Sequence, residues 1–203
     1  MSKTEVNLFT GDAVMLKWTG RIAVALAMVA FIGAGAARAQ MIEASGGWQD
    51  VTGSDFDGIG SGIGGSASVL FPVSSVVLGA GAGYFSHSID NFDPNLKLLS
   101  IVGVIRYPFA TQGSVKPFVG AQGGWIQDKV SSGGSTAKAN GFLAGGEVGI
   151  QYAVSPMINL LLAGYYNYLN FGDTKVDGTT ISDSKATGGA FGLRGGFNVN
   201  LKK

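Results

Sequence analysis

The sequence contains no cysteine, so no disulfide can stabilise the fold. Charged residues are also scarce, at 13% of the chain, and the 14 basic residues nearly balance the 13 acidic ones. A nearly neutral chain without a basic run offers no electrostatic surface for nucleic acid. Beyond the N-terminal segment, no apolar run approaches the ~18 residues that a transmembrane helix needs. These absences exclude a disulfide-stabilised domain and a helical membrane protein, and they predict no nucleic-acid partner.

The N-terminus has the pattern of a cleavable export signal. Basic residues precede the apolar run Ile22–Ala37, which ends in the small-x-small motif Ala37-Arg38-Ala39. The apolar core is shorter than the ~20 residues of a comfortable membrane span. We therefore expect a signal peptide over residues 1–39 and one exported domain over residues 40–203. Exported domains often rely on disulfides, so this domain needs another source of stability.

The clearest pattern in the exported part is an unbroken alternation from Phe191 to Leu201. Phe191, Phe197 and Leu201 share one parity, whereas Arg194 and Asn198 share the other. Successive side chains of a strand point to opposite faces, so this segment is predicted to have one apolar and one polar face. Glycine is abundant, with 34 residues, and in strands it permits tight bends and close packing in a narrow barrel.

Weaker copies of this pattern recur along the exported chain and predict eight strands. Most of them match or exceed the ~9–11 residues that a tilted strand needs to cross a bilayer, whereas globular strands average ~5–6 residues. The segments are about Met41–Val51, Ile63–Val73, Val76–Ile89, Leu96–Phe109, Val115–Val130, Gly141–Val154, Ile158–Gly172 and Gly188–Leu201.

The connections between these segments alternate between short and long. Four of the five prolines lie at the three short turns, where their missing N–H removes no ladder hydrogen bond. The long, polar connections are residues 52–62, 90–95, 131–140 and 173–187. Short turns at one rim and long loops at the other are typical of outer-membrane barrels with periplasmic turns.

Charge avoids one face of the predicted strands. In Gly141–Val154, Phe142, Val148 and Ile150 share one parity and Glu147 has the other. A soluble barrel needs a polar outer face, but here the uncharged parity is the apolar one, so we expect lipid outside. Aromatic residues gather near strand ends and predict two interfacial girdles. Those toward the short turns are Phe71, Tyr107, Phe109, Phe118 and Tyr152, and those toward the long loops are Trp48, Tyr84, Trp125, Phe142, Tyr166 and Tyr168.

With this topology and terminal strand, the chain resembles the small eight-stranded outer-membrane barrels of Gram-negative bacteria, the OmpA-like and OmpX-like porin-family β-barrel domains. The resemblance extends from about Met41 to Leu201 and includes no catalytic motif. It implies an all-β fold, an eight-stranded antiparallel up-and-down transmembrane barrel, in the bacterial outer membrane. It also implies contact with outer-membrane lipid and lipopolysaccharide, recognition by the outer-membrane assembly machinery, and a monomer. Members commonly end on an aromatic residue, whereas this chain ends Leu201-Lys202-Lys203.

Four charged residues fall on the inward parity, namely Glu43, Arg106, Glu147 and Arg194. An unpaired charge in a narrow lumen is costly, so we predict a network in which opposite charges pair. Candidates to extend this network are Gln49, Gln122 and Asn198. We favour the interpretation that the network is a plug filling the interior. The alternative is a gate on a path for small solutes.

Other motifs give little support for chemistry. His87 is the only histidine, and the adjacent Ser86 and Ser88 point to the opposite face, so we expect a rim histidine rather than a catalytic base. Gly60–Gly65 matches G-x-G-x-x-G without a following helix, and we expect a flexible loop exit there. The acidic segment Asp55–Gly58 lacks the later ligands of a calcium loop. We therefore expect no catalytic residue, no cofactor and no metal.

These patterns favour a non-enzymatic barrel with a structural or surface-interaction role. Its loops would meet a host, phage or envelope partner, because loops vary freely and carry specificity. The alternatives are a narrow pore for small solutes, a lipid-modifying barrel enzyme, and a soluble periplasmic barrel that binds a lipophilic ligand. One further alternative assigns lipopolysaccharide and its bridging divalent ions to the loop aspartates and to Lys129, Lys138, Lys175 and Lys185.

Overall fold

The computed structural model describes residues 41–89, 92–109 and 112–201. The expected signal peptide, residues 1–39, lies outside the described residues. Within the described ranges, no helix is both long and apolar enough to cross a membrane. The long strands are β1 (Met41–Thr52), β2 (Ile59–Val73), β3 (Val76–Ile89), β4 (Phe92–Pro108), β5 (Val115–Ser132), β6 (Ser135–Ala153), β7 (Ile158–Phe171) and β10 (Ala186–Asn200). Three short elements lie between them: the 3-10 turn η1 (Ser54–Phe56), β8 (Thr174–Val176) and β9 (Thr179–Ile181).

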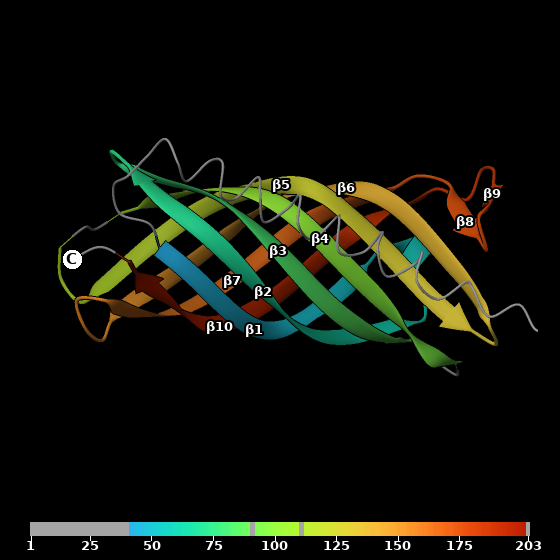
Figure 1. The fold of residues 1–203 in the computed structure, drawn as a ribbon, viewed down its shortest axis with the longest axis horizontal. Helices are drawn as coiled ribbons and strands as arrows, with labels where there is room; N and C mark the ends of the chain where they lie inside the picture. The colour runs from blue at the N-terminus through green and yellow to red at the C-terminus, as the bar shows by residue number, and fades with distance from the viewer. Residues whose placement is uncertain (1–40, 90–91, 110–111, 202–203) are drawn as a thin grey trace, which may run out of the picture. The chain divides into compact units, whose positions relative to one another are not determined.

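The eight long strands close into an antiparallel barrel (Figure 1). Each strand pairs with its neighbours in chain order, and β5 pairs with β6 so that the sheet has no break there. The last strand pairs with the first, from Met41 opposite Asn200 to Thr52 opposite Gly189. Closure satisfies the backbone hydrogen-bonding groups without any edge. The predicted fold class, including the pairing of the closing strand with the first, is confirmed.

The long connections are shorter than expected, because β2 begins at Ile59 and β4 at Phe92, and the largest difference is at residues 131–140. Residues 131–140 are strand rather than loop, because β5 and β6 continue to Ser132 and Ser135. The turn between them is Gly133-Gly134, and both glycines have positive φ values, 56° and 89°. Positive φ at both central residues is the requirement of a type I′ hairpin turn, which glycine meets without steric cost. The prediction of a polar loop was wrong because the glycine pair ends the hairpin where composition alone indicated a linker.

A second correction concerns the glycine motif Gly60–Gly65. It lies within β2, which begins at Ile59, and it pairs with β1 and β3. The expectation of a flexible loop exit was therefore wrong. The missing side chains serve close packing instead, since a Cβ added to Gly62 would lie 2.7 Å from the His87 ring.

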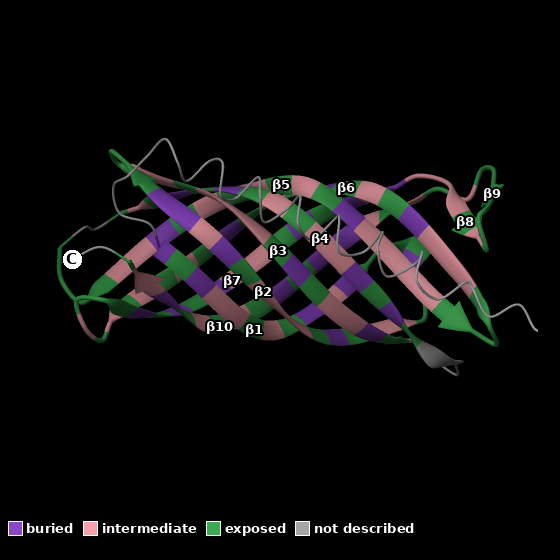
Figure 2. Cartoon of the chain, viewed as in Figure 1, coloured by how far each residue is buried: buried purple, intermediate pink, exposed green. Residues whose placement is uncertain are grey.

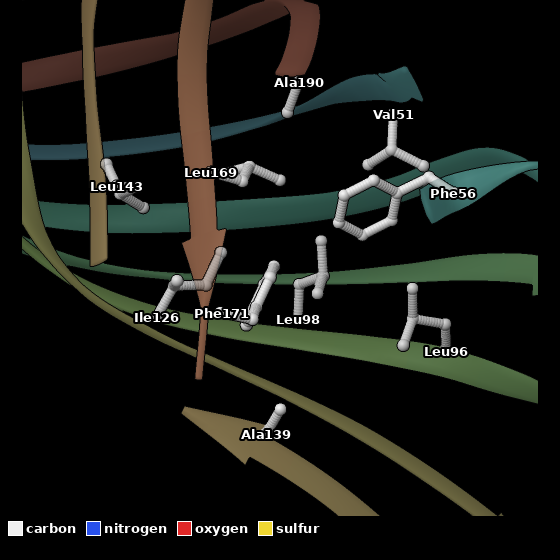
Figure 3. Close-up of a cluster of buried hydrophobic side chains, with 10 residues drawn as sticks. All are labelled: Val51, Phe56, Leu96, Leu98, Ile126, Ala139, Leu143, Leu169, Phe171 and Ala190. Atoms are coloured by element: carbon white, nitrogen blue, oxygen red, sulfur yellow. The ribbon is translucent and has the colours of Figure 1, made fainter. Parts of the chain in front are cut away.

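The loop-side half of the barrel interior is mostly apolar. Figure 3 shows Phe56, from η1, directed into the interior opposite Phe171, and the two rings lie edge to face with centroids 6.0 Å apart. The full cluster is Val51, Phe56, Leu96, Leu98, Ile126, Ala139, Leu143, Leu169, Phe171 and Ala190. This apolar cluster fills the lumen toward the long loops.

Burial alternates along the strands, as Figure 2 shows by the purple and green bands. The alternation corrects the expected girdle toward the short turns. Phe118 is buried, with 3% exposure, because it lies on the inward parity of β5. Phe71 is 8% exposed although it lies on the outward parity of β2. Tyr107, Phe109 and Tyr152 remain exposed at that end. All of the predicted aromatics toward the long loops are exposed.

Candidate functional site

The main polar feature of the lumen is a group of four charged residues that we call the lumen quartet: Glu43, Arg106, Glu147 and Arg194. They come from the neighbouring strands β1 and β10 on one side of the lumen and from β4 and β6 on the other, so the quartet crosses the barrel interior. Each lies in the half of its strand nearer the short turns. The structure brings together all four residues that the alternation placed on the inward parity.

Arg106 is the centre of the lumen quartet. Its Nη1 and Nη2 donate to Oε2 and Oε1 of Glu43 at 2.6 and 2.8 Å. Its Nε donates to Oε1 of Glu147 at 2.5 Å. The guanidinium carbon also lies 5.0 Å from the ring centroid of Phe118. Arg106 thus satisfies two carboxylates and stacks on an aromatic face, an arrangement that suits the planar guanidinium and not an ammonium group.

Arg194 completes the lumen quartet from the other side. Its Nη2 donates to Oε2 of Glu147 and lies 3.8 Å from Oε1 of Glu43. Two positive and two negative groups therefore cancel. Glu43, Arg106 and Glu147 are only 1–3% exposed, whereas the side chain of Arg194 is 10% exposed. Burying ions costs several kcal/mol each, and only close, hydrogen-bonded pairing offsets that cost.

Backbone space for the quartet comes from Gly120 on β5. Gly120 lies directly opposite Glu147 in the β5–β6 pairing. A Cβ at Gly120 would lie 2.9 Å from Glu147 Oε1, a distance that real Cβ contacts do not reach without a shift. A side chain at this position would displace the carboxylate from Arg106. The glycine-rich composition was visible in the sequence, but the partner of this glycine was not.

Only one of the three predicted extenders contacts the quartet. Asn198 Nδ2 lies 3.4 Å from Glu43 Oε2. Gln122 instead donates to Asn167 at 2.8 Å, and Gln49 pairs with His87. The polar interior is therefore divided into the quartet and separate amide pairs.

His87 is buried and not at the rim as predicted. It has 0% exposure because it lies on the inward parity of β3. Its Nδ1 is 3.1 Å from the Gly60 carbonyl oxygen and its Nε2 is 3.1 Å from Gln49 Oε1. A catalytic histidine needs a nucleophile on one nitrogen and an orienting group on the other, whereas these partners are a carbonyl and an amide. The parity of β3 was the signal that could have placed this histidine inside.

A cavity of about 60 Å³ separates the lumen quartet from the apolar cluster. Its polar lining includes Ser66, Ser68, Gln122, Asn167 and Arg194. Apolar side chains, among them Leu98, Val104 and Ile126, complete the lining. A volume of this size holds roughly four water molecules. Side chains therefore fill the lumen at both ends of a small chamber of mixed polarity. Among the described residues, no group of three or more metal-ligating side chains is placed to hold a metal ion.

The outer face shows where the barrel meets a membrane. Along the β5–β6 hairpin, outward pairs are apolar from Val115 opposite Tyr152 to Trp125 opposite Phe142. The next outward pair is Gln127 opposite Asn140, and the pair after it is Lys129 opposite Lys138. The apolar stretch from Val115 to Trp125 is eleven residues, which matches the ~9–11 residues of a tilted strand that crosses a bilayer.

Other strands repeat the same boundary on the loop side. In each, an exposed aromatic residue is followed, two positions toward the loops, by a polar one. The pairs are Trp48 and Asp50 on β1, Tyr84 and Ser86 on β3, and Tyr168 and Asn170 on β7. Aromatic belts of this kind sit at the membrane–water interface. The apolar outer surface is therefore a lipid-facing band with a defined upper edge.

Comparisons with solved structures give the same architecture. The crystal structure of Neisserial surface protein A matches with a TM-score of 0.66 and 24% sequence identity, over 79% of this chain and 97% of that one. The fold is that of the small outer-membrane β-barrels. A major outer membrane protein from Thermus thermophilus shares this barrel fold with a TM-score of 0.54 and 12% identity, over 80% of this chain and 99% of that one. The outer membrane protein OprG from Pseudomonas aeruginosa has a TM-score of 0.51 and 13% identity, over 81% and 96%.

No protein-family model matches this chain, and no curated protein sequence matches it. The barrel fold therefore rests on structural likeness and on the pattern of the residues. It supplies the scaffold, and the site must supply the function.

Proposed function

We propose that the protein is an exported, non-enzymatic outer-membrane barrel with a structural or surface-interaction role. The observation that supports this most strongly is the outer face of the β5–β6 hairpin. There, eleven residues of apolar pairs end in Trp125 and Phe142 and are followed by amide and ammonium pairs. Such a sequence of polarity suits a strand that leaves a bilayer through its interface.

The long-loop end carries the surface available to a partner. Beyond Trp125 and Phe142, β5 and β6 continue as a paired hairpin for residues 127–140. The small hairpin of β8 and β9 pairs with β6 at Ala137 and Lys138. Thr187 N–H donates to Asp55 at 2.8 Å and joins the first and last loops. These contacts favour a structured platform, which would meet a host, phage or envelope partner.

Several features of biogenesis belong to the same proposal. Residues 1–39 would be removed as a signal peptide, and the outer-membrane assembly machinery would insert the barrel as a monomer in contact with lipid and lipopolysaccharide. N-terminal sequencing of the membrane-extracted protein should begin at Gln40. A mature N-terminus within residues 1–30 would contradict the signal peptide.

The test of the location combines membrane fractionation with a heat-modifiability gel. We expect the protein in the outer-membrane fraction, with a different mobility in boiled and unboiled samples, because a closed barrel resists detergent until heated. A soluble protein, or identical mobility in both samples, would overturn the proposal.

A narrow pore is the second candidate function, and the cavity between the quartet and the apolar cluster, which Ser66, Gln122 and Arg194 help to line, is the observation that favours it. The apolar cluster argues for the plug, because it fills the loop-side half of the lumen. Planar-bilayer recordings of the refolded chain decide between them. Discrete single-channel steps would support the pore, and a silent bilayer with inserted protein would support the plug.

A further inference from the structure

Four lysines form one cross-strand row at the loop-side end of the barrel. Lys97 on β4 lies opposite Lys129 on β5. Lys129 lies opposite Lys138 on β6, and Lys138 lies opposite Lys175 on β8. These residues are up to 78 positions apart in the sequence, and the strand register alone brings them into line. We call Lys97, Lys129, Lys138 and Lys175 the lysine row.

The lysine row lies on the outer face of the barrel. Directly opposite residues of an antiparallel pair point to the same face. Lys129 and Lys138 share the outward parity of Trp125 and Phe142, which are 37% and 51% exposed. Neighbouring strands are about 4.8 Å apart, so the row extends over roughly 14 Å.

Nothing in the described residues neutralises the lysine row. Among the described residues, every ion pair involves Glu43 or Glu147 inside the lumen, and none involves a lysine of the row. Asp128 next to Lys129 has the inward parity and accepts from the Ala139 N–H. Asp177 near Lys175 accepts from the Thr136 N–H at 2.8 Å. Because like charges directly opposite each other destabilise a sheet, an anion bound from outside the chain would stabilise four of them in register.

The height of the lysine row indicates where that anion lies. The row is four residues beyond Trp125 and Phe142 along β5 and β6. At ~3.3 Å per residue and a tilt of about 40°, this is roughly 10 Å above the aromatic boundary. Lysine stems can extend back toward the interface while the ammonium stays hydrated. The Gln127 and Asn140 amides, bonded to each other at 2.8 Å, lie between the two levels. The ammonium groups therefore lie at the depth of lipid headgroups.

We propose that the lysine row binds a multiply phosphorylated lipid headgroup of the outer leaflet, of the lipopolysaccharide class. Several phosphates on one headgroup match several ammonium groups on one line. The site includes Lys97, which no motif in the sequence indicates, and it excludes Lys185, which has no partner in the row. The inference rests on the proposed membrane location, because it requires the outer face of the barrel at the lysine row to contact lipid headgroups.

The test is binding of the refolded full-length chain to vesicles containing lipopolysaccharide, in wild type and in the double variant Lys129→Gln and Lys138→Gln. A lysine near an anionic surface contributes about a factor of five to binding, so the double variant should bind roughly 25-fold more weakly. Lys185→Gln is the matched control and should bind like wild type. A heat-modifiability gel on every variant establishes that the barrels are folded.

Two results would overturn the proposal. One is equal binding of wild type and double variant to the lipopolysaccharide vesicles. The other is an equal loss of binding to vesicles of phosphatidylglycerol, which has one phosphate, since multiple phosphates would then have no part. Cell fractionation of the double variant tests the outer-membrane location separately from lipopolysaccharide binding by the lysine row. A variant that remains in the outer membrane but binds lipopolysaccharide like wild type contradicts the lysine row and leaves the location intact.

Discussion

The lumen quartet and the lysine row are both groups of four charged side chains, each drawn from four strands, and they differ in every other respect. The quartet is buried, has no net charge and is held by hydrogen bonds of 2.5–2.8 Å around Arg106. The row has a single sign, is at least partly exposed, and has no acidic partner among the described residues. Inside the barrel, water and lipid cannot supply a counter-charge, so the chain itself must. At the rim the surroundings can supply one.

The largest effect should follow from removing Arg106. In Arg106→Ala the carboxylates of Glu43 and Glu147 remain buried with only Arg194 between them, and the free energy of unfolding should fall by about 3–5 kcal/mol. Urea unfolding in lipid vesicles measures the change. Arg106→Lys is the control and should recover only part of the loss, because an ammonium cannot bind both carboxylates with a planar fork. A loss below about 1 kcal/mol in Arg106→Ala would show that the quartet does not brace the lumen.

A glycine substitution can break the quartet without changing any charge. Gly120→Val should force Glu147 away from Arg106 and lower the free energy of unfolding by about 1–3 kcal/mol. Gly123→Val is the matched control, because a Cβ at Gly123 has its nearest neighbour at an ordinary 3.6 Å. Unfolding of both variants is measured in the same vesicles. Equal stabilities would contradict the packing argument.

Arg194→Ala tests whether the quartet is a plug or a gate. Its side chain is 10% exposed, so solvent compensates part of the loss, and we expect a decrease of roughly 1–2 kcal/mol in the free energy of unfolding. A plug predicts lower stability with no change in single-channel conductance. Raised conductance in planar bilayers would support the gate instead.

Removing a charge from the lysine row should raise the stability of the barrel, whereas removing one from the lumen quartet should lower it. Lys138→Glu converts two like-charge contacts, with Lys129 and Lys175, into attractive ones. In detergent without lipopolysaccharide, stability should rise by up to about 1 kcal/mol, the range of cross-strand pairs. Lys185→Glu serves as the control. If Lys138→Glu were less stable than wild type, the row would not be strained by its own charge.

The smallest effect concerns the loop hairpin and depends on pH. The Thr136 N–H donates to Asp177, and this hydrogen bond, followed by one from Ser135, lowers the pKa of the Asp177 carboxyl below its ordinary value of 3.8. Because the pKa of Asp177 is lower in the folded state than in the unfolded state, the carboxylate contributes stability at neutral pH. This contribution is lost as the pH falls from about 3.8 through the lowered pKa. The protection of the Thr136 amide, its hydrogen-exchange rate relative to the intrinsic rate at the same pH, should therefore fall in acid, and less so in Asp177→Asn. A pH-independent exchange difference would contradict this origin.

Much of the barrel could be predicted because alternation is a local property. Period-two patterning identified eight strands, separated lipid-facing from inward residues, and placed Glu43, Arg106, Glu147 and Arg194 on one face. The predictions were wrong where we used amino-acid composition or position near a strand end instead of the alternation. His87 and Phe118 lie inward as their parity requires, although their positions near strand ends indicated a rim and a girdle. Residues 131–140 looked like a linker but pair as a hairpin around Gly133-Gly134.

The sequence by itself determined which side of the wall each residue faces, since neighbouring side chains of a strand must point to opposite faces. Only the tertiary structure decided which residues meet across the wall or the lumen. That depends on the register between strands and on closure of β1 against β10, which bring together positions far apart in the chain. The quartet around Arg106 and the row from Lys97 to Lys175 are both products of register. A shift of one residue between strands would turn the side chains to the other face and abolish both.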